Sequence, residues 1–168
     1  MESNKYHFED HWDVPFPIQD VWDVLARPRE FPRWWKGVYL SAEPLDAVNG
    51  EPRVGFRIAV VARGWLPYKL RFIIETLALE KPRLIVFKAS GDFETDDSRW
   101  LLTPNNAGTH VVLDWNPMVR KPIVKLFSPV LKPLFRWNHN WTMVRGQRQI
   151  VEYMSKRADR RSHECAGN

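Results

Sequence analysis

The 168-residue sequence contains one cysteine, Cys165, and no apolar run of the length that crosses a membrane. A single cysteine cannot form an internal disulfide, and this count is typical of proteins that fold in a reducing compartment. The first residues also lack the apolar segment of a secretory signal peptide, and a membrane-spanning helix needs about 20 apolar residues in a row. We therefore expect a cytoplasmic protein that does not span a membrane.

The sequence also lacks the motifs of several enzyme classes. It has no glycine-rich phosphate loop, no His-Glu-x-x-His pair, no Cys-x-x-Cys pair and no nucleophile elbow. The histidines are scattered at His7, His11, His110, His139 and His163, so we predict no metal site and no cofactor. The net charge of +5 is not accompanied by a nucleic-acid-binding motif, and we predict no nucleic-acid partner.

Aromatic residues, by contrast, are plentiful. They make up 13% of the chain and include 9 tryptophans, within a hydrophobic content of 44%. This composition excludes a disordered protein and is typical of a large packed interior. We predict a single domain over residues 1–168, with an ordered core over about 6–157 and a basic, frayed tail over 158–168.

The start of the chain combines one strand with two short helices. Residues Tyr6–Val14 predict a strand, which ends at Pro15 and Pro17 because proline cannot donate to a sheet ladder. Apolar residues at helical spacing predict a helix over Ile18–Leu25. A second short helix is expected over Arg29–Trp35.

The middle of the chain is patterned for β-strands. Turn residues such as Asn49-Gly50 and Lys81-Pro82 separate the apolar segments, and connections this short favour antiparallel pairing. The predicted strands are Val38–Glu43, Val54–Ala62, Tyr68–Leu79, Leu84–Ala89, Phe93–Thr103 and His110–Trp115. Alternation places one set of side chains on the covered face of the sheet: Phe56, Ile58, Val60, Tyr68, Leu70, Phe72, Ile74, Ile85, Phe87, Trp100, Leu102, Val111, Leu113 and Trp115.

A long helix is expected to follow, from near Pro133 to about Arg160. At 3.6 residues per turn, its apolar arc contains Trp137, Met143, Val144, Ile150, Val151 and Met154. The polar side chains of Asn140 and Gln147 fall inside this arc. The opposite, solvated face holds Asn138, Thr142, Arg145 and Gln149. A mostly apolar face with a few inward polar groups is typical of the wall of a ligand cavity.

Three local sequence patterns occur within this predicted order of strands and helices. They are Pro17–Leu25 followed by Phe31–Trp35, then Gly91–Phe93 with Trp100, Gly108-Thr109 and Trp115, and finally Arg136–Trp141 with Met143 and Gly146. Over about residues 6–153, these patterns and the order of elements resemble the START-like, or SRPBCC, superfamily. Within it, the resemblance is to the bacterial polyketide cyclase/dehydrase and lipid-transport family. In a related bacterial subgroup, an acid often occupies the position of Asn140.

The resemblance implies an α+β helix-grip fold. In this fold a curved, seven-stranded antiparallel sheet wraps around a long C-terminal helix, and two short helices follow the first strand. Members of the superfamily carry lipids, bind hormones or cyclise polyketides, so the fold alone does not define the function.

We therefore predict that the protein binds a hydrophobic or aromatic small molecule, lipid-like or polyketide-like, in an internal cavity between the sheet and the long helix. The side chains expected to contact this ligand are Trp35, Phe56, Tyr68, Phe72, Phe87, Trp100, Trp115, Trp137, Asn140 and Val144. The alternative for each tryptophan is that it packs in the core without contacting a ligand.

Two alternatives stay open. In the first, the protein is a cyclase, aromatase or dehydratase in which Tyr68, His139 or Asn140 orients an oxyanion or moves a proton. His139 can equally be a structural histidine tied to the sheet. In the second, the basic and apolar segment before the long helix contacts an anionic membrane during lipid exchange, or is simply a connector. Its cations are Lys121, Lys125, Lys132 and Arg136.

Overall fold

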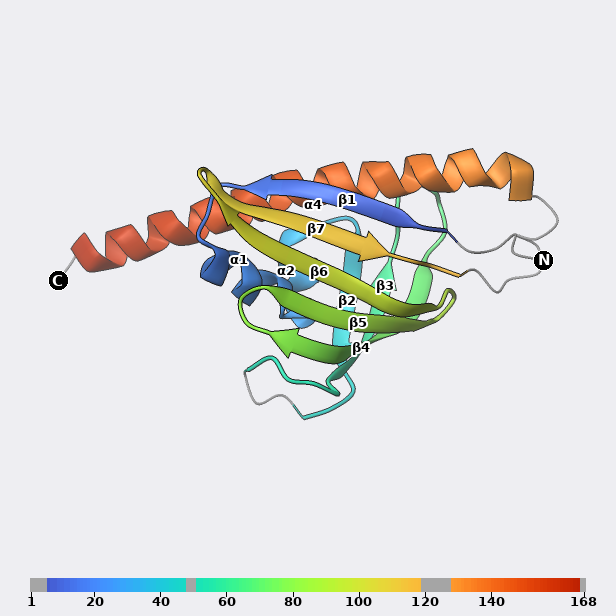
Figure 1. Cartoon of the computed structure of the whole chain (residues 1–168), viewed down its shortest axis with the longest axis horizontal. Helices are drawn as coiled ribbons and strands as arrows, with labels where there is room; N and C mark the ends of the chain where they lie inside the picture. The colour runs from blue at the N-terminus through green and yellow to red at the C-terminus, as the bar shows by residue number, and fades with distance from the viewer. Residues whose placement is uncertain (1–5, 48–50, 119–127, 167–168) are drawn as a thin grey trace.

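The computed structural model describes residues 6–47, 51–118 and 128–166, and their elements follow the predicted order (Figure 1). The strands are β1 (Phe8–Val14), β2 (Tyr39–Pro44), β3 (Arg57–Ala62), β4 (Leu70–Glu80), β5 (Leu84–Gly91), β6 (Thr95–Asn105) and β7 (Gly108–Trp115). The helices are α1 (Ile18–Leu25), the short 3-10 helix η1 (Pro28–Glu30), α2 (Phe31–Trp34) and α4 (Ser128–Ala166).

The seven strands form one antiparallel sheet in the order β1-β7-β6-β5-β4-β3-β2. Strands β2 to β7 pair with their neighbours in sequence, whereas β1 pairs with β7, with Phe8 opposite Trp115. The first strand therefore lies at the edge of the sheet, where α4 contacts it. Together with the two short early helices, this arrangement confirms the predicted helix-grip fold.

Local irregularities bend the sheet. The pairing register of β5 with β6 shifts between Phe87 and Ala89, and such bulges increase twist and curvature. Gly91 ends β5 with a φ of 145°, and a Cβ at this position would lie 2.5 Å from the carbonyl oxygen of Arg71. Glycine is required there because any side chain would collide with the neighbouring backbone. The curved sheet leaves space in front of its inner face.

Short helices cover one end of that inner face. Helix α1 has the predicted bounds and buries Val21, Trp22, Val24 and Leu25. The segment predicted as one short helix is divided into η1 and α2. Pro32 lies in the first turn of α2, where a backbone N–H has no intrahelical acceptor. The absence of this N–H in proline therefore costs the helix no hydrogen bond.

Helix α4 runs along the sheet, contacts β1 and α2, and extends beyond the sheet at its C-terminal end (Figure 1). It begins at Ser128 rather than near Pro133 because a proline removes one backbone hydrogen bond without necessarily ending a helix. Residues 158–166, predicted as a frayed tail, continue the helix. No helix in the described ranges is both long and apolar enough to cross a membrane.

The core is divided into two clusters. The larger packs Trp12, Trp35 and Ile150 with other side chains beneath the helices, and the smaller joins Ile58 and Phe72 with neighbours from the central strands. Phe87 and Trp115 pack against both clusters. Side chains of both clusters line the cavity described below.

Candidate functional site

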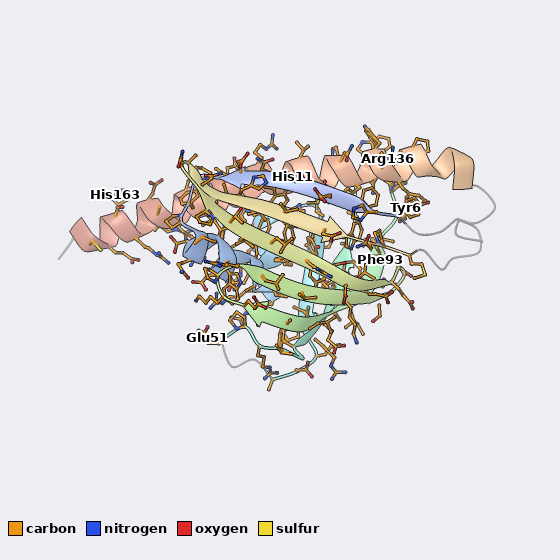
Figure 2. The ribbon with its side chains drawn as sticks, in the orientation of Figure 1. Tyr6, His11, Glu51, Phe93, Arg136 and His163 are labelled. Carbon is orange, nitrogen blue, oxygen red and sulfur yellow. The ribbon has the colours of Figure 1, made fainter. Side chains whose placement is uncertain are left out.

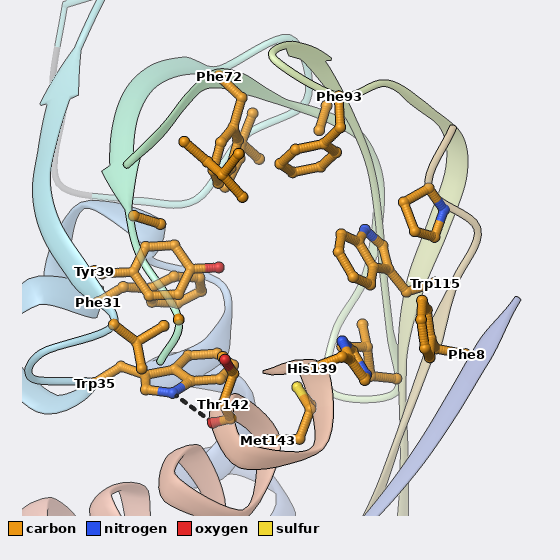
Figure 3. Close-up of a pocket in the computed structure, with 18 of the residues that line it drawn as sticks. Phe8, Phe31, Trp35, Tyr39, Phe72, Phe93, Trp115, His139, Thr142 and Met143 are labelled. Carbon is orange, nitrogen blue, oxygen red and sulfur yellow. Dashed lines mark hydrogen bonds between the residues drawn. The ribbon is translucent and has the colours of Figure 1, made fainter. Parts of the chain in front are cut away.

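An aromatic cavity of about 510 Å³ lies between the curved sheet and α4 (Figure 3). This volume is within the range of small-molecule sites in proteins. The rings that border it are Tyr6, Phe8, Phe31, Trp35, Tyr39, Tyr68, Phe72, Phe87, Phe93, Trp100, Trp115 and Phe135. Many aromatic residues therefore surround an open space, while others such as Trp12, Trp22 and Trp34 are buried away from it.

One wall of the cavity joins the short helices to α4. Trp35 is only 2% exposed, and its Nε1 donates a hydrogen bond to the backbone oxygen of Thr142 at 3.1 Å (Figure 3). Its ring also stacks on Trp34, with ring centroids 5.2 Å apart. Gly146, one turn further along α4, allows this approach because a Cβ there would lie 2.6 Å from Cε2 of Trp35. This wall is therefore closely packed against α4.

His139 reaches the opposite wall from α4 (Figure 3). Its side chain is 8% exposed, and its Nε2 lies 2.6 Å from Oδ2 of Asp10 in β1. The imidazole stacks on Phe8 and on Trp115, with centroid separations of 4.1 and 5.2 Å. His139 is thus tied to the sheet, as the structural interpretation requires, and it also borders the cavity.

Two tyrosines bring hydroxyl groups to the cavity. Tyr39 points its hydroxyl into the space, and burial raises the pKa of this phenol far above its ordinary value (Figure 3). Tyr68 is 39% exposed at the rim, and partial burial raises its pKa as well. Because burial disfavours the phenolate, both hydroxyls keep their protons at neutral pH and can donate or accept hydrogen bonds.

The connection between β3 and β4 is fastened to α4 beside the cavity. Oδ1 of Asn138 accepts a hydrogen bond from the backbone N–H of Leu66 at 3.3 Å, and both residues border the cavity. A Cβ at Gly64 would collide with the Asn138 side chain, so glycine allows this contact. Next to it, Trp65 and Trp137 pack edge to face with centroids 4.6 Å apart, although they are 57% and 45% exposed.

Most, but not all, of the side chains predicted to contact a ligand border the cavity. Those that border it are Trp35, Tyr68, Phe72, Phe87, Trp100 and Trp115. Those that do not are Phe56, Trp137, Asn140 and Val144. Phe56 lies just before β3, packs against the smaller core cluster and is covered by the guanidinium of Arg53 at 5.6 Å. Ligand contact by the bordering residues stays a prediction.

Three of these exclusions lie on α4, where the predicted inward arc was only partly correct. Met143, Ile150 and Met154 are buried as predicted, whereas Trp137 and Val144 are exposed. The buried positions are His139, Met143, Gly146, Ile150 and Met154. At about 100° per residue, Asn140 lies more than a quarter turn from His139, and Trp137 lies on nearly the opposite side. Asn140 is exposed and Val144 is 72% exposed. Asn140, a candidate catalytic residue, is therefore not placed at the cavity.

The ring of Trp137 packs against Trp65 outside the cavity and does not face the core. Asn138 and Thr142, predicted as solvated, border the cavity. Other bordering residues that the sequence did not single out are Phe31, Tyr39 and Phe93.

The cations predicted to contact a membrane are only partly placed. Lys121 and Lys125, and the side chain of Lys132, lie outside the described residues. Arg136 is exposed at the end of the molecule where Tyr6 and Phe93, which border the cavity, are also found (Figure 2). Over the described part of the chain, no group of three or more histidine, cysteine or acidic side chains is placed to hold a metal ion.

Several solved structures share this fold. The ZhuI aromatase/cyclase from a Streptomyces species has a TM-score of 0.73 at 14% sequence identity, covering 92% of this chain and 96% of its own. A Thermus thermophilus protein, TTHA0849, has a TM-score of 0.65 at 20% identity, covering 89% and 98%. The di-domain ARO/CYC BexL has a TM-score of 0.61 at 13% identity, covering 88% of this chain and 50% of its own.

Sequence comparison assigns the family. No curated protein matches this chain. The sequence profile of one family, described as polyketide cyclase / dehydrase and lipid transport, matches residues 5–152. That range includes every strand and the part of α4 that borders the cavity. The chain therefore belongs to the polyketide cyclase/dehydrase and lipid transport family.

Proposed function

We propose that the protein binds a hydrophobic, largely aromatic small molecule, lipid-like or polyketide-like, inside the cavity. The observation that carries this proposal is the open volume of about 510 Å³ among aromatic rings in an otherwise packed core. Interiors normally exclude spaces of this size because unfilled volume costs contact energy. Filling the space with an apolar ligand gains roughly 25 cal/mol for each Å² of apolar surface removed from water.

The distribution of polar groups supports the same proposal. His139, Tyr39 and Tyr68 are separated around an apolar lining, so they suit a ligand with a few polar atoms on an apolar skeleton. Such groups orient a ligand, while the surrounding rings supply most of the binding energy. Flat walls such as Trp115, which stacks on His139, favour planar molecules.

A reaction of the cyclase, aromatase or dehydratase type is the second candidate. The observation that favours it is the pairing of His139 with Asp10 at the cavity wall, because histidine–carboxylate pairs can move protons. Tyr39 and Tyr68 can stabilise an oxyanion in the same space. Both candidates use one cavity, and ligand binding comes first in each.

Lipid exchange at a membrane surface is favoured by a different observation. Trp65 and Trp137 are exposed together beside the cavity, and Arg136 is exposed next to them on α4. Tryptophan is enriched where proteins meet the membrane interface, and cations attract anionic lipids. Exchange at this surface would use the same internal ligand site.

Native mass spectrometry of protein purified without detergent tests the main proposal. We expect a bound small molecule with an apolar skeleton, released on denaturation and identifiable by its mass. Any protein found empty is then mixed with N-phenyl-1-naphthylamine, a fluorescent aromatic compound that is bright in apolar surroundings. A protein that is empty and also takes up none of this compound would contradict the proposal.

A further inference from the structure

The pairing of His139 with Asp10 determines which ring nitrogen is left to face a ligand. A carboxylate accepts hydrogen bonds and cannot donate them, so the proton of the neutral imidazole lies on Nε2, directed at Asp10. Nδ1 then carries a lone pair. Within the described residues, Nδ1 has no hydrogen-bond partner. Among the described residues, His139 thus brings to the cavity wall an acceptor to which no protein group donates.

The apolar surroundings of the imidazole raise the free energy of a complex in which Nδ1 has no hydrogen-bond donor. The ring is 8% exposed and is stacked on Phe8 and Trp115, which pack against it through their faces. Once a ligand fills the cavity and excludes water from it, an acceptor left without a partner costs about 1–3 kcal/mol. A ligand group that donates a hydrogen bond removes this cost, whereas a ligand oxygen that only accepts does not.

Resting on the proposed function, we infer that the ligand carries a hydroxyl group on an aromatic or enolic carbon and places it against Nδ1 of His139. Such hydroxyls are attached to planar, apolar skeletons, which match the aromatic walls, and they are far more acidic than aliphatic alcohols. His139 can therefore accept the proton as well as the hydrogen bond. In that step the O–H bond breaks, an N–H bond forms at Nδ1, and the oxygen keeps the electron pair.

Asp10 acts here as a positioning residue. Its carboxylate, 2.6 Å from Nε2, fixes the tautomer of the imidazole and stabilises the imidazolium that forms when Nδ1 takes a proton. The side chain of Asp10 is 16% exposed, so solvent screens this interaction only weakly. Across the cavity, the hydroxyl of Tyr39 can donate to a second ligand oxygen (Figure 3).

Three naphthalene derivatives test the inference, each measured by displacement of N-phenyl-1-naphthylamine. 2-Naphthol can donate a hydrogen bond, whereas 2-methoxynaphthalene and 2-acetonaphthone can only accept one. We expect the wild-type protein to bind 2-naphthol about tenfold more tightly than the other two, the ratio that one satisfied buried hydrogen bond produces. The ether also reports on the cavity itself, because it needs only apolar contacts.

Substitutions assign the selectivity to His139. The double variant Asp10→Asn, His139→Phe keeps a ring in the stack and leaves no buried charge, and we expect it to bind 2-naphthol and 2-methoxynaphthalene equally. His7→Phe, at a histidine whose side chain is 61% exposed, should retain the wild-type ratio. Nitrogen NMR of the wild-type protein should show Nδ1 of His139 unprotonated and shifted by 2-naphthol but not by the ether.

The outcomes separate this inference from the proposed function. Equal binding of 2-naphthol and the ether to the wild-type protein overturns the inference and leaves the cavity as a binding site. Tighter binding of the ketone than of 2-naphthol also overturns it, because Nδ1 would then carry a proton. Failure of all three compounds to displace bound N-phenyl-1-naphthylamine overturns the inference alone. If N-phenyl-1-naphthylamine does not bind either, and the protein is purified empty, the proposed function fails along with the inference.

Discussion

The bare backbone of Gly146 lies against the indole of Trp35, so close that a Cβ would be 2.6 Å from Cε2 of the ring. This contact sets the distance between α4 and the wall of the cavity that Trp35 forms. Trp12 meets the same glycine from β1, at 2.9 Å from the same Cβ position. A single glycine therefore allows two large rings to pack beneath the long helix.

We expect Gly146→Ala to destabilise the protein. Alanine raises helix propensity by about 1 kcal/mol, but overpacking against two buried indoles costs about 1–3 kcal/mol, and the backbone must shift to relieve it. The net loss should appear as a lower midpoint in urea denaturation. Ser155→Ala on the exposed part of α4 is the control and should change the midpoint little. A stabilised Gly146→Ala protein would contradict this packing.

We expect Asn138→Ala to speed ligand release. The substitution removes the acceptor for the Leu66 N–H, which fastens the β3–β4 connection to α4, and it should cost about 1 kcal/mol of stability. The dissociation rate of N-phenyl-1-naphthylamine in stopped-flow fluorescence should rise. Asn140→Ala is the matched control, since Asn140 is exposed two residues away on the same helix. Equal effects of both substitutions would rule out a fastening role for Asn138.

Membrane contact through Trp65 and Trp137 is tested by vesicle flotation. With vesicles of phosphatidylcholine and phosphatidylserine at low salt, we expect the wild-type protein to float and Trp65→Ala, Trp137→Ala to stay in solution. Salt should weaken the association because Arg136 contributes through charge. Leu45→Ala, at an apolar residue that is 49% exposed elsewhere, serves as the control. A wild-type protein that never floats would exclude this surface as a membrane contact.

The buried phenol of Tyr39 makes stability depend on alkaline pH. An unfolded tyrosine loses its proton near pH 10, while burial raises the pKa of Tyr39 in the folded protein. The contribution of Tyr39 is therefore fully present below about pH 10 and is lost as pH rises further, because only the unfolded chain then ionises. Tyr39→Phe should lose less unfolding free energy than the wild type between about pH 9 and pH 11. If the unfolding free energies of the two proteins change with pH in parallel, burial does not raise the pKa of Tyr39.

The fold was largely predictable because period-two alternation and turn residues are local signals. Ile58, Val60, Phe72 and Ile74 are buried as their alternation predicts, and α1 has the predicted bounds. The strand-rich middle of the chain left only the C-terminal helix to cover the sheet. These features depend on neighbours in sequence, which is why a single sequence was sufficient.

The site was less predictable because its geometry depends on contacts between distant segments. His139 and Asp10 are 129 residues apart, and no local pattern pairs them. The predicted inward arc of α4 was correct at Met143, Ile150 and Met154 but not at Trp137, which packs against Trp65, a contact that hydrophobicity alone does not reveal. Strand residues near the cavity were predicted more accurately, since their faces alternate with a strict period of two.

The central claim is that the space between the sheet and α4 binds an aromatic ligand, and one pair of substitutions tests it most directly. Thr142→Phe inserts a ring from α4 into the cavity, whereas Val144→Phe adds the same ring to a position that is 72% exposed on the same helix. Binding of N-phenyl-1-naphthylamine is measured by fluorescence titration of both variants and the wild type. We expect Thr142→Phe to bind at least about tenfold more weakly and Val144→Phe to match the wild type. Equal binding by all three proteins would contradict the account.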